Sequence, residues 1–143
     1  AELSKNRTSD YIFEWSTMLS FDGNTAPYLM YAYARIRSIL NKQSVTKDTL
    51  GITLLSSKEE RALLVKVLQL PETVDAVAAD CYPNQLCNYL YELAGLFMRF
   101  YEACPILKAE GETQHSRLAL AAFTADALAQ GLNLLGIEPL EQM

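Results

Sequence analysis

Apolar residues between Gln85 and Ala103 recur every three or four positions, and this spacing constrains the fold more than any other feature of the chain. The stripe consists of Leu86, Leu90, Leu93, Phe97 and Phe100. Side chains at that interval share one face of an α-helix, so the segment predicts a long helix with one buried side. Pro105 should end it, because proline cannot continue a helix.

Turn and capping residues mark the other helices. Asn24 or Thr25 can cap a helix whose first turn contains Pro27, and either Ser56 or Ser57 has a glutamate three residues on, which is a capping-box pattern. We expect a short helix over 13–20, a helix after Ser57 that Pro71 breaks or kinks, and a final helix over 113–134. Gly136 is a plausible C-cap for the last helix.

Strand signals are missing: the sequence has no alternating apolar pattern and no Asn-Gly hairpin. A narrow face of small and apolar side chains on the final helix, formed by Leu118, Ala121, Ala122, Ala125 and Leu128, favours close helix packing. The fold class that follows is all-α, a bundle of about five helices.

The length of 143 residues suits one domain, 1–143, with residues 1–10 as a polar connector and 137–143 as a tail. No apolar run approaches the roughly 18 residues that span a bilayer, so we expect no membrane segment. Cys81, Cys87 and Cys104 lack CxxC spacing, and the single histidine, His115, is distant from them. We therefore expect reduced thiols and neither a metal site nor a catalytic residue.

Charge is unevenly distributed along the chain. The net charge is −5, which argues against nonspecific coating of nucleic acid. Between residues 23 and 47, however, there is no acid at all, whereas Arg35, Arg37, Lys42 and Lys47 are basic. A basic patch on an acidic body favours a local contact with one anionic partner.

The basic run coincides with a tyrosine-rich helix. At about 100° per residue, Leu29, Ala32, Tyr33, Ile36 and Leu40 form the core face, while Tyr28, Tyr31, Arg35 and Lys42 share a separate arc about 60° wide. Rings beside cations can bind single-stranded nucleic acid through base stacking and phosphate contacts. Half-buried tyrosines that only pack, with their hydroxyls in water, are the alternative interpretation. We expect Trp15, by contrast, to be a packing anchor.

Several sequence blocks resemble the C-terminal anticodon-binding domain, of DALR type, of arginyl-tRNA synthetases, and the bacterial enzymes most of all. The blocks are Asn6-Arg7-Thr8 with Asp10-Tyr11 and Trp15, GNTAPY at 23–28 with Tyr31-Ala32 and Ala34-Arg35, Leu90–Ala94 with Phe100-Tyr101 and Cys104–Leu107, Ser116–Leu118, and Leu134–Ile137 with Met143. They occur in the family's order across the whole chain, and the match is weakest between residues 41 and 70.

The resemblance implies a parent enzyme, a cytoplasmic class I synthetase that activates arginine with ATP and Mg and transfers it to tRNA. Signatures of the HIGH and KMSKS kinds are absent, so the catalytic half would lie outside this chain, which alone would have no enzyme activity and no cofactor. The implied partners are the anticodon stem-loop of arginine tRNA and the catalytic domain. We expect a monomer that binds neither DNA nor a membrane.

The resemblance also implies tRNA-binding residues. Tyr28 and Tyr31 would be stacking platforms, Arg35 a phosphate or base contact, and Lys42 an outer phosphate contact. Met143 would end near the anticodon pocket, and Asn24 would contact RNA if it is not simply a capping residue. Met30 and Gln142 depart from the family pattern, in which Gln and Arg are common at these positions.

Two other functions stay open on the sequence. A helical protein-docking or dimerisation domain could use the same tyrosine and arginine face against protein. A corresponding domain of another class I synthetase, such as the cysteine enzyme, is chemically closer, but the GNTAPY run and the terminal methionine disfavour it. Salt separates RNA from protein partners, because each phosphate contact on a single strand costs about 0.7 log unit of affinity per decade of salt.

Overall fold

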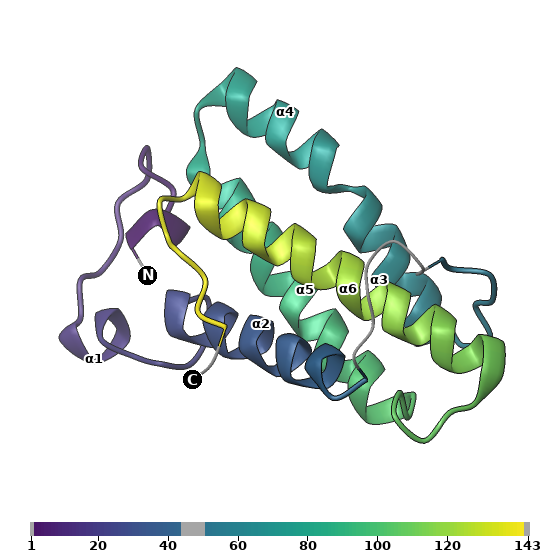
Figure 1. Ribbon diagram of the computed structural model, residues 1–143. Helices are drawn as coiled ribbons and strands as arrows, with labels where there is room; N and C mark the ends of the chain where they lie inside the picture. Colours follow the sequence, from purple (N-terminus) through teal and green to yellow (C-terminus); the bar gives the residue numbers. More distant parts are fainter. Residues whose placement is uncertain (1, 44–50, 142–143) are drawn as a thin grey trace.

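The computed structural model describes residues 2–43 and 51–141, and every regular element within them is a helix (Figure 1). The elements are the 3₁₀ helix η1 (Glu2–Ser4) and the α-helices α1 (Trp15–Met18), α2 (Ala26–Asn41), α3 (Lys58–Leu68), α4 (Leu70–Asp80), α5 (Pro83–Ala103) and α6 (Gly111–Leu134). The predicted all-α bundle is confirmed, with α2–α6 as its five helices. None of the described helices is long and apolar enough to cross a bilayer.

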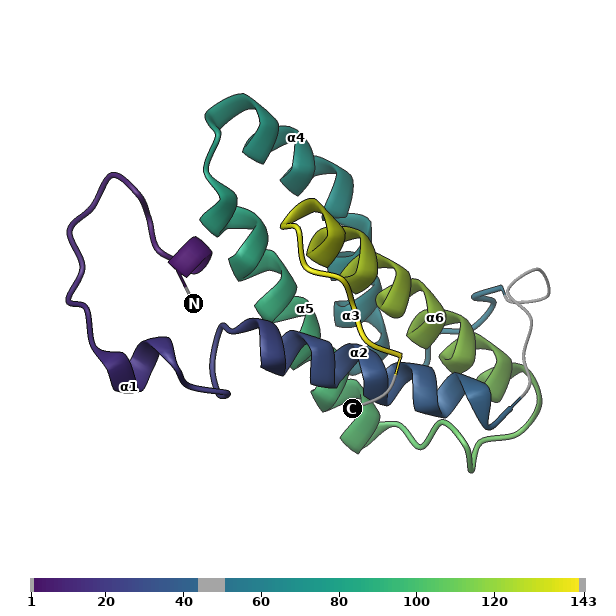
Figure 2. The same ribbon diagram turned by 60° about the vertical axis from the view of Figure 1, so that its left-hand side comes forward.

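The bundle is built around α5 and α6, which α2 and α3 flank in both views (Figures 1 and 2). Helix α4 continues from α3 and packs against the first part of α5. Beyond α6 the chain turns back, and the C-terminal tail runs along the bundle to α2 (Figure 2). At the N-terminus η1 contacts α5, whereas α1 lies apart from the bundle (Figure 1).

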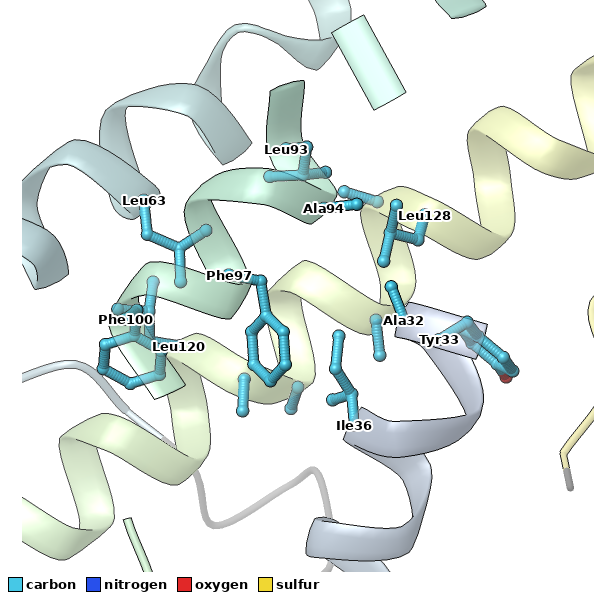
Figure 3. Close-up of a cluster of buried hydrophobic side chains, with 14 of the residues drawn as sticks. Ala32, Tyr33, Ile36, Leu63, Leu93, Ala94, Phe97, Phe100, Leu120 and Leu128 are labelled. Atoms are coloured by element: carbon cyan, nitrogen blue, oxygen red, sulfur yellow. The ribbon is translucent and has the colours of Figure 1, made fainter. Parts of the chain in front are cut away.

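The core forms where the apolar faces of four helices meet. Phe97 of α5 lies at its centre beside Ile36 of α2, and Leu63 and Leu128 close it from α3 and α6 (Figure 3). The side chains predicted for the stripe on α5 are all buried, as are those for the core face of α2 and the small-residue face of α6. Tyr33 lies at the edge, with its hydroxyl pointing away from the cluster (Figure 3).

Local sequence explains where most helices begin. Ser57 caps α3 through a complete capping box with Glu60. Pro71 divides the following segment as predicted, since α3 ends at Leu68 and α4 starts at Leu70. Helix α6 ends at Leu134, and Gly136 takes a positive φ of 75° just beyond it, a conformation that glycine adopts without strain.

Four predictions about the helices and their packing differ from the structure. The short helix expected over 13–20 is confined to Trp15–Met18. Helices α5 and α6 each begin two residues before the predicted Gln85 and Thr113, because Pro83 needs no N–H partner in a first turn and Gly111 tolerates a φ of 58°. The expectation that Trp15 anchors the packing is wrong. Its side chain is 70% exposed, because α1 lies away from the bundle, and its ring contacts Phe13 edge-on at 5.1 Å between centroids.

A buried ion pair connects the start of α3 to α6. Glu60 is only 2% exposed and accepts a 2.7 Å hydrogen bond from Arg117 Nε as well as bonds from the backbone N–H groups of Ser56 and Ser57. Arg117 also donates to the carbonyl of Pro105 at 2.9 Å. Burial opposes ionisation of Glu60, but these hydrogen bonds outweigh it and hold the pKa of the carboxyl below its usual value.

Candidate nucleic-acid interface

Tyr31, Arg35 and Lys42 of the predicted surface line one hollow on the outer side of α2. The hollow has a volume of about 560 Å³, and its remaining lining residues are Ala34, Ser38, Asn41 and Glu141. Tyr31 is 47% exposed, so one side of its ring is open to solvent. The structure therefore brings together an accessible ring and two cations, as the helical spacing predicts.

Arg35 is held between two aromatic rings. Its guanidinium carbon lies 4.7 Å from the ring centroid of Tyr101 on α5 and 5.9 Å from that of Tyr31. Its Nη1 also donates a 3.2 Å hydrogen bond to the Tyr31 hydroxyl. A planar cation fixed in this way can present its remaining N–H groups to a phosphate or a base edge at little entropic cost.

The C-terminal tail forms part of the same hollow through Glu141. One carboxylate oxygen accepts a 2.7 Å hydrogen bond from Arg37 Nε, and the other accepts a 3.0 Å bond from the Tyr33 hydroxyl. Arg37 is therefore paired, and among the described basic residues of the predicted patch the charges left to face the hollow are those of Arg35 and Lys42.

Tyr28 does not join Tyr31, although the helical arc predicts that it should. It is only partly exposed, and its ring meets that of Tyr91 on α5 with centroids 5.4 Å apart and planes inclined by 56°. The two rings border a second hollow of about 510 Å³. Arg99 of α5 also lines this hollow. The contact with α5 separates the two tyrosines into different sites.

Asn24 contacts another part of the bundle rather than capping α2. Its side-chain amide donates a 3.0 Å hydrogen bond to Asn88 Oδ1 of α5. Thr25 occupies the capping position, but its hydroxyl donates to the carbonyl of Phe21 and no side-chain bond caps the helix. The predicted capping role of Asn24 is therefore wrong, and its role as an RNA contact stays a prediction.

Some predicted residues lie outside the described part of the chain. These are Met143, Lys47 and Gln142. The residues that the sequence interpretation missed are Tyr91, Arg99 and Tyr101 of α5 and Glu141 of the tail. Tyr91 and Arg99 are eight residues apart on α5, and this helical spacing could have indicated that they lie on one side of the helix. Nothing in the local sequence connects Glu141 to α2.

The described residues contain no group of three or more His, Cys, Asp or Glu side chains that could hold a metal ion. All three cysteines are free, with Cys87 and Cys104 buried and Cys81 exposed. The chemistry that the described site offers is binding, through rings, cations and hydrogen-bond donors.

Comparisons with known proteins confirm the resemblance in the sequence. Residues 29–143 match the family described as the DALR anticodon binding domain. The arginine–tRNA ligase of Colwellia psychrerythraea is 60% identical over 145 residues, and that of Marinomonas is 58% identical over 144 residues. Each alignment covers the whole of this chain but 25% of the relative, so the chain spans about a quarter of the length of these relatives.

Solved structures agree with the sequence comparison. The chain is similar to the arginyl-tRNA synthetase of Thermus thermophilus, with a TM-score of 0.83 and 35% identity over 92% of this chain and 23% of that one. The arginyl-tRNA synthetase of Plasmodium falciparum gives a TM-score of 0.82 and 33% identity over 99% of this chain and 25% of that one. The helical arrangement thus recurs in both larger proteins.

Proposed function

Since the chain belongs to the DALR anticodon-binding domain family, we propose that it binds the anticodon stem-loop of arginine tRNA on behalf of an arginine–tRNA ligase. The observation that carries this proposal is the accessible ring of Tyr31 beside the stacked guanidinium of Arg35, in a hollow that also contains Lys42. Loop nucleotides of RNA are recognised by such arrangements, in which bases stack on rings and hydrogen-bond at their edges.

In this role the domain itself carries out no chemistry. Arginine activation with ATP and Mg, and transfer to the tRNA, belong to a catalytic part that this chain does not contain. The domain acts in the cytoplasm as one attached unit of a monomeric enzyme, and it binds RNA rather than DNA or a membrane.

Exposed apolar side chains between residues 12 and 21 support the attachment of this N-terminal segment to another protein surface. Apolar side chains crowd its exposed face, with Ile12 85% and Phe21 76% exposed, together with Trp15 and Leu19. Patches of this kind on soluble domains mark protein interfaces. We assign this segment to contact with the catalytic part, and the same observation favours the second candidate function, a protein-docking domain.

Binding of this chain to an arginine anticodon stem-loop tests the proposal. The loop is compared with a copy in which the middle anticodon base is changed, at two salt concentrations. We expect tighter binding to the correct loop and a loss of about 5- to 150-fold in the Tyr31→Ala variant, equivalent to the 1–3 kcal/mol of one stacked base.

Tyr11→Ala is the matched control, because Tyr11 is a similarly exposed tyrosine on the N-terminal segment. Equal affinity for both loops would contradict recognition of the anticodon by α2. Equal losses of affinity in the Tyr31 and Tyr11 variants would contradict it as well. Salt-insensitive binding to a protein partner without RNA binding would favour the docking function instead.

A further inference from the structure

The hollow between α2 and α5 is a second feature of the kind that binds RNA. Helix α2 crosses α5 (Figure 2). The ring of Tyr28 on α2 contacts that of Tyr91 on α5. The two hollows share no lining residue, although Tyr28 and Tyr31 are less than one helical turn apart on α2. Two separate sites therefore lie next to each other along one helix.

Arg99 supplies a positive charge to this second hollow, and on its other side it borders a neighbouring hollow together with Glu59 and Glu102. Its side chain is exposed, and within the described residues it makes no ion pair and no hydrogen bond. The carboxylate that shares the hollow, Glu92, is paired with Lys66. Among the residues that line this hollow, Arg99 is therefore the charge left to contact an anion that enters beside the rings.

The field of Arg99 reaches the tyrosine pair. Burial raises the pKa of the Tyr28 phenol, the neighbouring Tyr91 raises it further, and Arg99 acts in the opposite direction by favouring the phenolate. The guanidinium of Arg99 therefore acts electrostatically on the Tyr28 phenol, and both residues line the same hollow.

Gly95 keeps the hollow open. It lies in the interior of α5, where glycine weakens a helix, yet a Cβ built on it would meet only Nη1 of Arg99, at 3.9 Å. A larger residue would fit without a clash at its Cβ and would fill the space between Tyr91 and Arg99. The absence of a side chain here leaves room for a ligand.

We propose that this hollow binds a second nucleotide of the same RNA loop, with its base against the rings of Tyr28 and Tyr91 and its phosphate at Arg99. The proposal rests on the proposed function, because it assigns a further contact to the same RNA. A volume of about 510 Å³ lies within the range of small-ligand sites, roughly 300–1,000 Å³.

The test uses anticodon stem-loops that carry the fluorescent base 2-aminopurine at one loop position at a time. Stacking on a tyrosine changes the fluorescence of this base, so each titration reports both affinity and the position that stacks. The variants are Gly95→Leu, which fills the second hollow without removing a contact, Arg99→Gln, and Tyr31→Ala in the first hollow. Arg61→Ala, at an exposed arginine of α3, is the control.

We expect Gly95→Leu to weaken binding about 5- to 150-fold, the range for one stacked base, and to abolish the fluorescence change at one loop position. Tyr31→Ala should abolish it at a different position. Arg99→Gln should reduce the salt dependence by about 0.7 log unit per decade, and Arg61→Ala should leave it unchanged.

Wild-type affinity in Gly95→Leu and Arg99→Gln, alongside a loss in Tyr31→Ala, would overturn this inference alone and leave the hollow to a protein partner. The inference would also be overturned if Gly95→Leu and Tyr31→Ala abolished the fluorescence change at the same loop position. A single nucleotide would then contact both hollows. No binding by the wild type would overturn the proposed function itself.

Discussion

Arg37 of α2 donates a 2.7 Å hydrogen bond to Glu141, 104 residues further along the chain, and this contact holds the C-terminal tail against the first hollow. The hydrogen bond from Arg37 and, secondarily, that from Tyr33 lower the pKa of the Glu141 carboxyl. Because the folded pKa lies below the unfolded one, this attachment is complete above the usual glutamate range and is lost as the pH falls through the folded pKa.

Removing the Arg37–Glu141 pair should free the tail without unfolding the bundle. Since Glu141 is more than half exposed, Glu141→Ala should change the free energy of unfolding by less than about 1 kcal/mol. Carboxypeptidase should release residues 138–141 about two- to five-fold faster, and equally so in Arg37→Ala. Lys58→Ala is the control, and unchanged release in both variants would show that the pair does not hold the tail.

Charge and shape at Arg35 can be separated by two substitutions. Arg35→Gln should weaken RNA binding and lower its salt dependence by about 0.7 log unit per decade. Arg35→Lys should weaken binding as well, because an ammonium cannot stack on Tyr101 or donate as a planar fork, but it should keep the wild-type salt dependence. Full affinity in Arg35→Lys would show that only the charge of Arg35 matters.

Breaking the Glu60–Arg117 pair should cost far more stability than breaking the surface pair. Arg117→Ala leaves a buried carboxylate without its cation, and we expect a loss of about 3 kcal/mol in urea unfolding at neutral pH. Because the folded pKa of Glu60 is depressed, the wild type should lose stability as the pH falls below the usual glutamate range. The Arg117→Ala variant should lose less stability than the wild type over the same fall in pH. Parallel stability profiles against pH would show that Arg117 does not lower the pKa of Glu60.

Two glycines offer a matched pair of alanine substitutions. A Cβ at Gly131 of α6 would overlap the fully buried side chain of Leu90, so Gly131→Ala should destabilise the bundle by about 1–3 kcal/mol in thermal unfolding. Gly95→Ala has space and should instead stabilise by up to about 1 kcal/mol. Stabilisation by both substitutions would show that helix propensity, and not packing against Leu90, decides the effect at Gly131.

Tyr89 should make the protein sensitive to alkali. Burial raises the pKa of its phenol to about 12, and the hydroxyl donates a 2.9 Å hydrogen bond to the carbonyl of Lys66. A raised folded pKa means that this stabilisation is complete below the unfolded pKa of about 10 and is lost as the pH rises toward 12. Tyr89→Phe should cost about 1 kcal/mol at pH 7 and flatten the alkaline decline, which unfolding between pH 8 and 12 would measure.

The sequence by itself determined the helices, because helix formation depends on neighbours within a few residues. The capping box at Ser57, the break at Pro71 and the apolar stripe of α5 each act over one to five turns, and each appears where the spacing predicts. The same local rules placed Tyr31, Arg35 and Lys42 on one face of α2.

Only the tertiary structure decided which of these side chains act together. Tyr28 shares an arc with Tyr31, yet contact with Tyr91 draws it into another hollow, and Arg37 is paired by a residue from the far end of the chain. Trp15 is exposed because α1 lies away from the core. Burial and charge pairing depend on which segments meet in space, and residues distant in sequence carry no local sign of that meeting.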